Sequence, residues 1–376
     1  MKRSLLIVCL VALLASCSDR PSPAAKGSPS TPSTSSRVVA LNSSELVAGQ
    51  TTFNTIRFVR VDGTEIRTFK LPKDSTPPTA GGDRVFFVVD GEVHSVDASG
   101  SSVNHGKFMD EEPAFTKLVV SPDGKRWAWT IEKRHQDDSI TSKLFIAGEG
   151  SDKAKVLLEE TSTVQTVAIP VLWTAAGLVV IDMPEGIGGL IFFADTYWGR
   201  SRLVDPDTGK STTLTHKADE CPLNDVSSDR SWTCVRKLGH GGGSVGTATK
   251  GTVVLHRPGS AEVELNIEQA ALQVGNAVIS PRGDRVAVGI YTGTRADESY
   301  SLSTIVFDVA MHSQTTASSD DTVPAAWLPD GSLVLVGADF ARPKGCSLLK
   351  PDGSTVNLGD GRFIGFLDAK GSVPAR

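Results

Sequence analysis

The sequence predicts an all-β fold, a seven-bladed β-propeller of four-stranded antiparallel blades. This prediction rests on two repeated hairpin patterns and on the length of the chain. The clearest copy of the first hairpin runs from Leu118 to Thr130, where two apolar runs flank Pro122-Asp123-Gly124. Pro sets φ for the first turn position, and Gly supplies the positive φ of a tight reversal. Beyond the N-terminal segments about 335 residues follow without a second linker, a normal length for seven blades.

Weaker copies of this first hairpin recur along the chain. They occur at 80–87, 172–179, 226–233, 277–288 and 326–336. The spacing from turn to turn is about 40 to about 55 residues, which is the period of a propeller blade and exceeds that of leucine-rich or helical solenoid repeats.

A second short hairpin recurs together with the first one in each repeat. Seven such hairpins occur, at 59–64, 96–100, 146–151, 204–210, 255–260, 307–311 and 349–354. Two hairpins per period give four antiparallel strands, and a radial stack of such units leaves no long exposed edge. Rings of six or eight blades are the alternatives.

The two ends of the domain are predicted to share a blade. Residues 363–371 read as one more first strand and turn with no blade behind them, and 37–71 hold an irregular start and a final hairpin. We therefore expect the C-terminal strand to join the N-terminal strands and close the ring.

The Ser121-Pro122-Asp123-Gly124-Lys125 turn resembles the hallmark of TolB-like, WD-repeat-like β-propellers of bacterial envelopes. Residues 280–283 and 328–331 match it in part, and the resemblance covers roughly residues 37 to 371. It implies a propeller fold and an extracytoplasmic location more firmly than an activity. A periplasmic assembly role like that of TolB proteins is a weaker interpretation, because no separate N-terminal α/β domain is found.

The N-terminus has the features of a secretion signal. Met1-Lys2-Arg3 is basic, residues 5–14 are apolar, and Leu14-Ala15-Ser16-Cys17 resembles a bacterial lipobox. An apolar run of about ten residues is too short to cross a bilayer, which needs about twenty. We expect a signal peptide over 1–16 and a lipid on Cys17, which would anchor the chain without spanning the membrane. The alternative is an ordinary secretory signal with an incidental cysteine.

The segment from Cys17 to Ser36 is rich in Ser, Pro and Thr. Such a composition cannot bury apolar surface and is typical of a flexible tether. The sequence thus predicts a signal peptide, a lipidated tether and a propeller domain over 37–376.

The charge pattern argues against nucleic acid as a partner. The formal net charge is −5 and no basic stripe is present. The expected partners are the membrane, through the lipid, and an envelope protein or other extracytoplasmic ligand.

The five cysteines have separate expected fates. Cys9 leaves with the signal and Cys17 takes the lipid. Cys221 and Cys234 flank the turn at 228–229 on adjacent strands, so an oxidising envelope favours a disulfide between them. Cys346 has no obvious partner and is interpreted as a buried thiol.

Two motifs that resemble known sites are interpreted as loops. Residues 240–246 contain a Gly-x-Ser-x-Gly string and a His-Gly-Gly-Gly string, but in α/β-hydrolases these lie on different strand–loop units. Residues 205–209 lack most oxygen ligands of a calcium loop and occupy a hairpin turn. No catalytic residue, cofactor or metal is therefore predicted.

Five tryptophans lie next to first-hairpin turns: Trp127, Trp129, Trp173, Trp232 and Trp327. Recurrence at the blade period favours packing between blades over a sugar-stacking platform.

Four successive connections between second and third strands are expected to be long, at 132–142, 183–200, 237–251 and 291–303. In a propeller they emerge on one face, where they would form one wall of a binding site. The candidate binding residues are His135, Asp137, Tyr197, Trp198, Arg200, His240, Tyr291, Arg295 and Asp297. The alternative is that long loops mark places where insertions are tolerated.

These observations favour a lipid-anchored, extracytoplasmic binding or scaffolding module. The alternative is a propeller-type envelope enzyme, a hydrolase or lyase, that uses acidic and His residues of the same loops. A binding module should present an apolar and aromatic patch, whereas an enzyme should bring carboxylates or a His together with perturbed pKa values.

Overall fold

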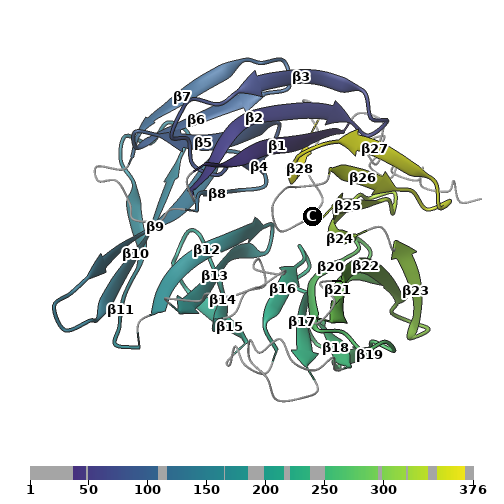
Figure 1. The fold of residues 1–376 in the computed structure, drawn as a ribbon. Helices are drawn as coiled ribbons and strands as arrows, with labels where there is room; N and C mark the ends of the chain where they lie inside the picture. The colour runs from purple at the N-terminus through teal and green to yellow at the C-terminus, as the bar shows by residue number, and fades with distance from the viewer. Residues whose placement is uncertain are drawn as a thin grey trace, which may run out of the picture. The chain divides into compact units, whose positions relative to one another are not determined.

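The computed structural model of the chain describes residues 37–47, 50–108, 117–164, 166–184, 199–215, 221–237, 250–294, 299–318, 321–337 and 345–368. These residues form seven four-stranded antiparallel sheets. The sheets stand as blades around a ring (Figure 1), which confirms the predicted seven-bladed β-propeller. Among the described residues no helix is long and apolar enough to cross a membrane.

We number the blades along the ring. Blade 1 contains β28 (Arg362–Leu367), β1 (Val38–Val47), β2 (Gln50–Arg60) and β3 (Glu65–Lys70). Blade 2 contains β4 (Thr79–Gly81), β5 (Arg84–Val89), β6 (Glu92–Asp97) and β7 (Ser102–Lys107). Blade 3 contains β8 (Val119–Val120), β9 (Arg126–Arg134), β10 (Ile140–Gly148) and β11 (Lys155–Ser162). Blade 4 contains β12 (Thr166–Thr174), β13 (Gly177–Pro184), β14 (Ser201–Val204) and β15 (Ser211–Thr215).

The remaining blades follow the same plan. Blade 5 contains β16 (Leu223–Val226), β17 (Trp232–Lys237), β18 (Gly251–His256) and β19 (Val263–Asn266). Blade 6 contains β20 (Gln273–Ile279), β21 (Arg285–Thr294), β22 (Ser299–Asp308) and β23 (Ser313–Ser318). Blade 7 contains β24 (Thr322–Trp327), β25 (Leu333–Gly337), β26 (Cys346–Leu349) and β27 (Thr355–Gly359).

The ring closes through a blade shared by the two ends of the domain. The strand β28 pairs with β1 in antiparallel register, with Val38 opposite Leu367 and Val39 opposite Phe366. The predicted closure by the C-terminal strand is therefore confirmed.

Apolar clusters fill the interfaces between neighbouring blades. The cluster between blades 2 and 3 contains Phe86, Trp127 and Trp129, and the cluster between blades 5 and 6 contains Val253 and Phe307. The five tryptophans that were expected to pack between blades are all buried, with at most 8% of each residue exposed. Their interpretation as packing residues is confirmed.

The Ser121–Lys125 turn forms the tight reversal that its sequence predicts. Gly124 has φ of 73°, and its N–H donates to the carbonyl of Ser121 at 2.8 Å. The Asp123 carboxylate accepts from the Ser121 hydroxyl at 2.6 Å and from the Lys125 N–H at 3.1 Å. The neighbouring blade contributes a further bond, because the N–H of Gly82 donates to the carbonyl of Pro122 at 3.0 Å.

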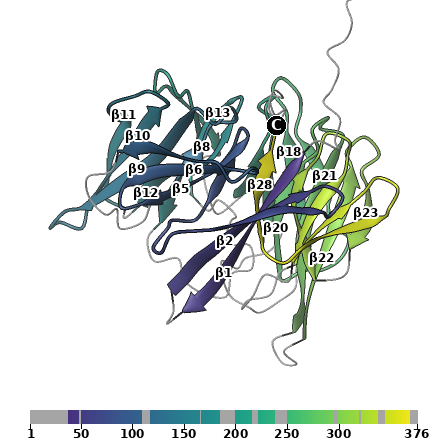
Figure 2. The same ribbon diagram turned by 90° about the horizontal axis from the view of Figure 1, so that it is seen from above.

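In each blade the connection between the second and third strands lies on the face of the ring opposite to the turn between the first and second strands. We call this face the connection face. Figure 2 shows β1, β2 and β22 extending toward one side of the ring. Two of the four connections expected to be long are instead mostly paired hairpin. β9 and β10 pair as far as Arg134 and Ile140, and β21 and β22 pair as far as Thr294 and Ser299. The prediction of long loops is wrong at these two places, because the strands continue their pairing beyond the body of the blade.

Candidate functional site

Blade 3 extends beyond blade 2 at the connection face. The strands β9 and β10 have nine residues each, whereas β5 and β6 have six each and are joined by the short turn at Asp90-Gly91. The extra length carries residues 132–142 and 159–162 past the sheet of blade 2. We call these residues the blade-3 overhang.

A shallow hollow of about 590 Å³, wide open to solvent, lies on the overhang. It is lined by His135, Gln136, Asp137, Ser139, Thr141 and Thr161. The lining is polar because the apolar row of β9, which includes Trp127 and Trp129 on the same side of the strand, ends before the overhang begins.

A short chain of hydrogen bonds orders this lining. His135 Nε2 lies 2.8 Å from the Thr141 hydroxyl, which lies 2.8 Å from the Thr161 hydroxyl. Asp137 accepts from the hydroxyl and the N–H of Ser139 at 2.7 and 3.1 Å. The hydrogen bond from the Ser139 hydroxyl, aided by the one from its N–H, lowers the pKa of Asp137. The hollow therefore presents an imidazole, hydroxyls and an ionised carboxylate in fixed positions.

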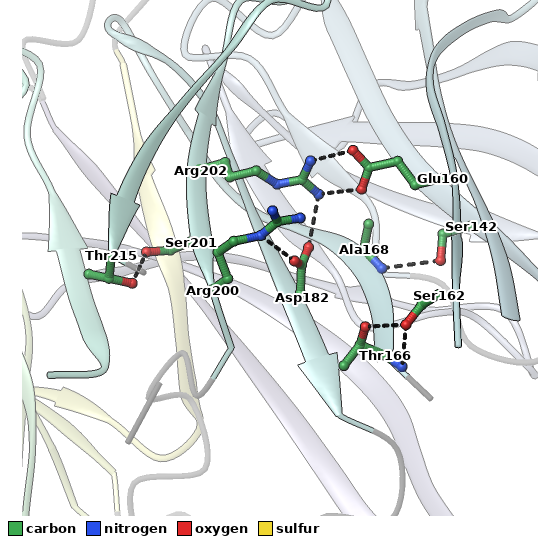
Figure 3. A network of polar contacts seen from close by, with 10 residues as sticks. All are labelled: Ser142, Glu160, Ser162, Thr166, Ala168, Asp182, Arg200, Ser201, Arg202 and Thr215. Atoms are coloured by element: carbon green, nitrogen blue, oxygen red, sulfur yellow. Dashed lines mark hydrogen bonds and ion pairs between the residues drawn. The ribbon is translucent and has the colours of Figure 1, made fainter. Parts of the chain in front are cut away.

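The side of the overhang that faces blade 4 carries a charged network (Figure 3). Arg202 on β14 contacts Glu160 on β11 through both carboxylate oxygens, at 2.5 and 2.9 Å. Arg202 also donates to Asp182 on β13 at 2.8 Å. Burial by itself lowers the pKa of Arg202, but the hydrogen bond and charge of Glu160 and the charge of Asp182 outweigh it, and the pKa is raised. Arg202 therefore stays protonated although only 3% of it is exposed.

Strand alternation explains why these charges meet. Leu178, Val180 and Asp182 share one face of β13, and the first two belong to the apolar cluster between blades 3 and 4. Arg202 lies opposite Val180 on the adjacent strand. The charged residues thus extend an apolar row toward the connection face, where water replaces apolar packing.

Arg200 forms the exposed end of the network. Its Nε donates to Asp182 Oδ2 at 2.7 Å, and 46% of its side chain is exposed against 16% for Asp182. Asp182 therefore holds one guanidinium at the surface through Oδ2 and the buried Arg202 through Oδ1.

The backbone before Arg200 passes very close to Asp182. A Cβ at Gly199 would lie within bonding distance of the Asp182 carbonyl oxygen, so only glycine fits there. The N–H of Asp182 donates to the carbonyl of Arg200 at 2.9 Å. This close approach fixes the position from which the Arg200 side chain leaves the backbone.

The structure brings together only some of the candidate binding residues. His135 and Asp137 line one hollow, and Arg200 lies on blade 4. Tyr291 is 3% exposed and packs between blades 6 and 7 with Leu302 and Val323, so it belongs to the core of that interface. The other candidates lie outside the described residues: Tyr197, Trp198, His240, Arg295 and Asp297.

Sequence reasoning missed several members of the site. They are Thr141, Glu160, Thr161, Asp182 and Arg202. The signal that could have found them is the change from apolar to polar residues within an alternating strand, as in Leu178-Val179-Val180-Ile181-Asp182. That signal shows where a strand leaves the core, but not which strand faces it from the next blade.

The predictions for the three cysteines in the described part of the chain are confirmed. Cys221 and Cys234 form a disulfide, with Cys234 opposite Leu223 across the strand pair. Cys346 is a buried free thiol, and burial raises its pKa to about 12. The described residues contain no group of three or more His, Cys, Asp or Glu side chains that could hold a metal ion.

Comparisons with known proteins identify the fold. No protein-family model matches the chain, and no curated protein matches it. Among solved structures, the chain is similar to oligogalacturonate lyase from Vibrio parahaemolyticus, with 9% identity, a TM-score of 0.54 and coverage of 84% of this chain and 92% of that one. It is also similar to Pyrococcus horikoshii acylaminoacyl peptidase, with 13% identity, a TM-score of 0.54 and coverage of 87% and 51%, so it spans about half of that chain.

A third similar structure bears on ring closure. The chain shares 14% identity and a TM-score of 0.52 with the β-propeller domain of the Trilobed protease from Pyrococcus furiosus, covering 87% of this chain and 93% of that one. That domain is described as having an open velcro topology. Here the pairing of β28 with β1 closes the ring. Identities this low establish the shared propeller fold alone.

Proposed function

We propose that this protein is a lipid-anchored, extracytoplasmic, TolB-like β-propeller that acts as a protein- or ligand-binding and scaffolding module of the cell envelope. The binding surface is the blade-3 overhang together with the adjoining rim of blade 4. The signal peptide, Cys17 and the tether determine the location, and the propeller provides the rigid body that presents the surface.

The observation that carries this proposal is the overhang itself. Blade 3 continues for several residues past its neighbour and presents a hollow of about 590 Å³ with hydroxyl, imidazole and carboxylate groups. Two of these groups, His135 and Asp137, were predicted as binding residues from the sequence. At the base of the overhang Lys143 pairs with Glu159, with the Lys143 Nζ and the Glu159 Oε1 3.1 Å apart.

Two further features support an extracytoplasmic location. The Cys221–Cys234 disulfide is the state expected of a cysteine pair in an oxidising compartment. The N-terminal sequence ends its apolar run at Leu14-Ala15-Ser16-Cys17, the pattern of a lipidation site.

Site-specific crosslinking tests the binding surface. A photoreactive residue at Gln136, which lines the hollow, should give a discrete crosslinked product in the native envelope. The same residue at Glu149, an exposed position in the β10–β11 turn on the other face, is the matched control. Equal labelling from both positions, or none from Gln136, would count against the overhang as a binding surface.

The second candidate function is a propeller-type envelope hydrolase or lyase. His135 beside the hollow favours it, since an imidazole can transfer protons near neutral pH. The lowered pKa of Asp137 favours binding instead, because a general acid or base near pH 7 needs a raised carboxyl pKa. Turnover of oligogalacturonate or a peptide that disappears in His135→Ala, with binding retained, would favour the enzyme.

A further inference from the structure

The junction between blades 2 and 3 contains a half-buried histidine, His105 on β7. The centroid of its ring lies 5.5 Å from that of Phe86 and 5.1 Å from that of Trp127. Phe86 belongs to blade 2 and Trp127 to blade 3, and both are fully buried. The register of β6 and β7 shifts between Asn104 and Gly106, which leaves His105 in a β-bulge. The histidine therefore contributes its ring to the packing of two blades.

Two hydrogen bonds determine which nitrogen of His105 carries the proton. Arg84 Nε lies 2.7 Å from the Ser95 hydroxyl oxygen, and that oxygen lies 2.8 Å from His105 Nε2. A guanidinium can only donate, so Ser95 accepts from Arg84 and has its own hydroxyl proton left for His105. Ser95 is 0% exposed, so this proton has no access to solvent. Nε2 therefore accepts, and the neutral ring carries its proton on Nδ1.

Protonation of His105 would break this arrangement. With a proton on Nε2, the ring would donate to the Ser95 oxygen, which already accepts from Arg84. The Ser95 hydroxyl proton would then lose its acceptor, and a buried polar group without a partner is destabilising. The imidazolium would also lie near the Arg84 guanidinium, whose Nη1 is 3.4 Å from the Asp97 carboxylate.

The charges around His105 favour the neutral ring as well. Among the described residues, the titratable groups that act on it are Arg84 and His94 of its own blade and Glu149 of blade 3. Burial lowers the pKa of His105, and Arg84 lowers it further. Glu149 opposes this fall and His94 adds to it. The ring of Trp127 attracts a cation and also opposes the fall, but it does not restore the hydrogen bond that the Ser95 hydroxyl loses.

We propose that His105 is an acid-sensitive contact between blades 2 and 3, in which the neutral ring holds the two blades together and protonation loosens them. This inference does not depend on the proposed binding function. Its structural basis is the fixed direction of the hydrogen bonds from Arg84 through Ser95 to a ring that packs on Trp127. Trp127 lies on β9, the strand that continues into the blade-3 overhang, so the contact lies at the base of that overhang.

The direction of the pH dependence follows from a ring that is held neutral. The contribution of His105 to stability is fully present above its ordinary pKa of 6.5 and is lost as the pH falls through the lower pKa of the folded state. His105→Gln cannot take up a proton, so the melting temperature of the wild type minus that of this variant should shrink between about pH 7 and about pH 5. His94→Gln, at a histidine of the same blade whose ring stacks on Phe87 at 5.7 Å, is the matched control and should keep the wild-type pH dependence.

Two further measurements distinguish an acid-sensitive contact from simple packing. Nitrogen-15 shifts of His105, assigned by single substitution of the other histidines, should show the proton on Nδ1 at neutral pH and a titration midpoint below 6.5. Ser95→Ala removes the hydroxyl that keeps Nε2 unprotonated, so it should raise that midpoint. Hydrogen exchange, corrected for the intrinsic effect of pH, should show that acid reduces protection in β7 and β9 relative to β21. This loss should occur in the wild type and in His94→Gln, but not in His105→Gln.

Three results would overturn the proposal. A proton on Nε2 at neutral pH would show that the hydrogen bonds run in the other direction. A midpoint at or above 6.5 would show that the folded state favours the charged ring. An acid loss of protection in β7 and β9 that is as large in His105→Gln as in the wild type would assign the loss to another group. The first two results come from the wild-type ring itself, so they decide the question even if His105→Gln fails to fold.

Discussion

Arg202 on blade 4 contacts Glu160 on blade 3 through two nitrogen–oxygen pairs, at 2.5 and 2.9 Å, and so joins two neighbouring blades. Arg202 has 4% of its side chain exposed, whereas Glu160 has 40%. The interface between these blades thus changes from apolar packing to an ion pair at the connection face. Arg202 also binds Asp182, whose other carboxylate oxygen accepts from Arg200.

The first prediction concerns this junction. Arg202→Ala should lower the free energy of unfolding by about 3 kcal/mol, the lower end of the range for breaking a buried pair, because Glu160 is partly hydrated. Chemical denaturation measures the change. The matched control is Arg282→Ala, at an exposed pair, which should change stability by less than about 0.5 kcal/mol. A similar small change in Arg202→Ala would show that the junction is dispensable for stability.

The fold follows from sequence more completely than the site does. The hairpin turns depend on local chemistry, such as the Pro122-Asp123-Gly124 reversal, and this chemistry is visible in one copy of the repeat. The Arg202–Glu160 pair joins residues 42 positions apart on different blades, and its formation depends on the register of two sheets. Neither the register nor the rotation of one blade against the next can be read from one sequence.

The two wrong expectations have a common cause. Residues 132–142 and 291–303 contain many polar residues, so they were expected to form loops. The structure keeps the described parts of both stretches mostly in paired strands, β9 with β10 and β21 with β22, because the strands continue their pairing where polar residues replace apolar ones. Tyr291 was misassigned for the same reason, since it lies on a strand that faces blade 7.

The second prediction concerns the lipid anchor. Cys17→Ser should release the protein into the soluble fraction of the envelope or the medium, because the thiol that would carry the lipid is lost. The melting temperature should stay the same, since the change lies outside residues 37–376 of the expected propeller domain. Fractionation followed by detection of the protein measures the first outcome. Retention of the variant on membranes would contradict lipidation at Cys17.

The third prediction concerns the disulfide. Cys221 and Cys234 are separated by 13 positions, so removal of the bond should lower the free energy of unfolding by about 3 kcal/mol, the value for a loop of similar length. Thermal melts with and without a reductant measure this loss. In the Cys221→Ala, Cys234→Ala double variant the reductant should have no further effect, because Cys346 is a buried free thiol. A reductant-sensitive double variant would point to another cross-link.

The fourth prediction concerns ring closure. Deletion from Arg362 to the C-terminus removes β28 and leaves the β1 edge at Val38–Asn42 without its partner. Exposed edges promote aggregation, so we expect loss of soluble protein. A shorter deletion that starts at residue 369 retains β28 and is the matched control. Equal solubility and melting temperature for both deletions would show that β28 is not needed for closure.

The last prediction concerns Asp368, which follows β28 at the closure. The residue is 7% exposed, and its Oδ2 is buried with no hydrogen-bond partner among the described residues, while its N–H donates to the carbonyl of Gly82 at 3.0 Å. Burial raises the pKa of Asp368 to about 6, with the nearby Arg37 opposing the rise and Asp83 adding to it. The folded state thus favours the protonated carboxyl.

The raised pKa fixes the direction of the pH dependence. The contribution of Asp368 to stability is fully present below its ordinary pKa of 3.8 and is lost as the pH rises through about 6. Asp368→Asn should therefore match the wild type near pH 4 and exceed its melting temperature near pH 7, when melts are compared across this range. Asp352→Asn is the control with the opposite sign, because hydrogen bonds from Ser354 lower the pKa of Asp352, and it should lose stability at neutral pH. If the melting temperatures of the wild type and Asp368→Asn differed by the same amount at every pH, Asp368 would titrate as an ordinary carboxyl.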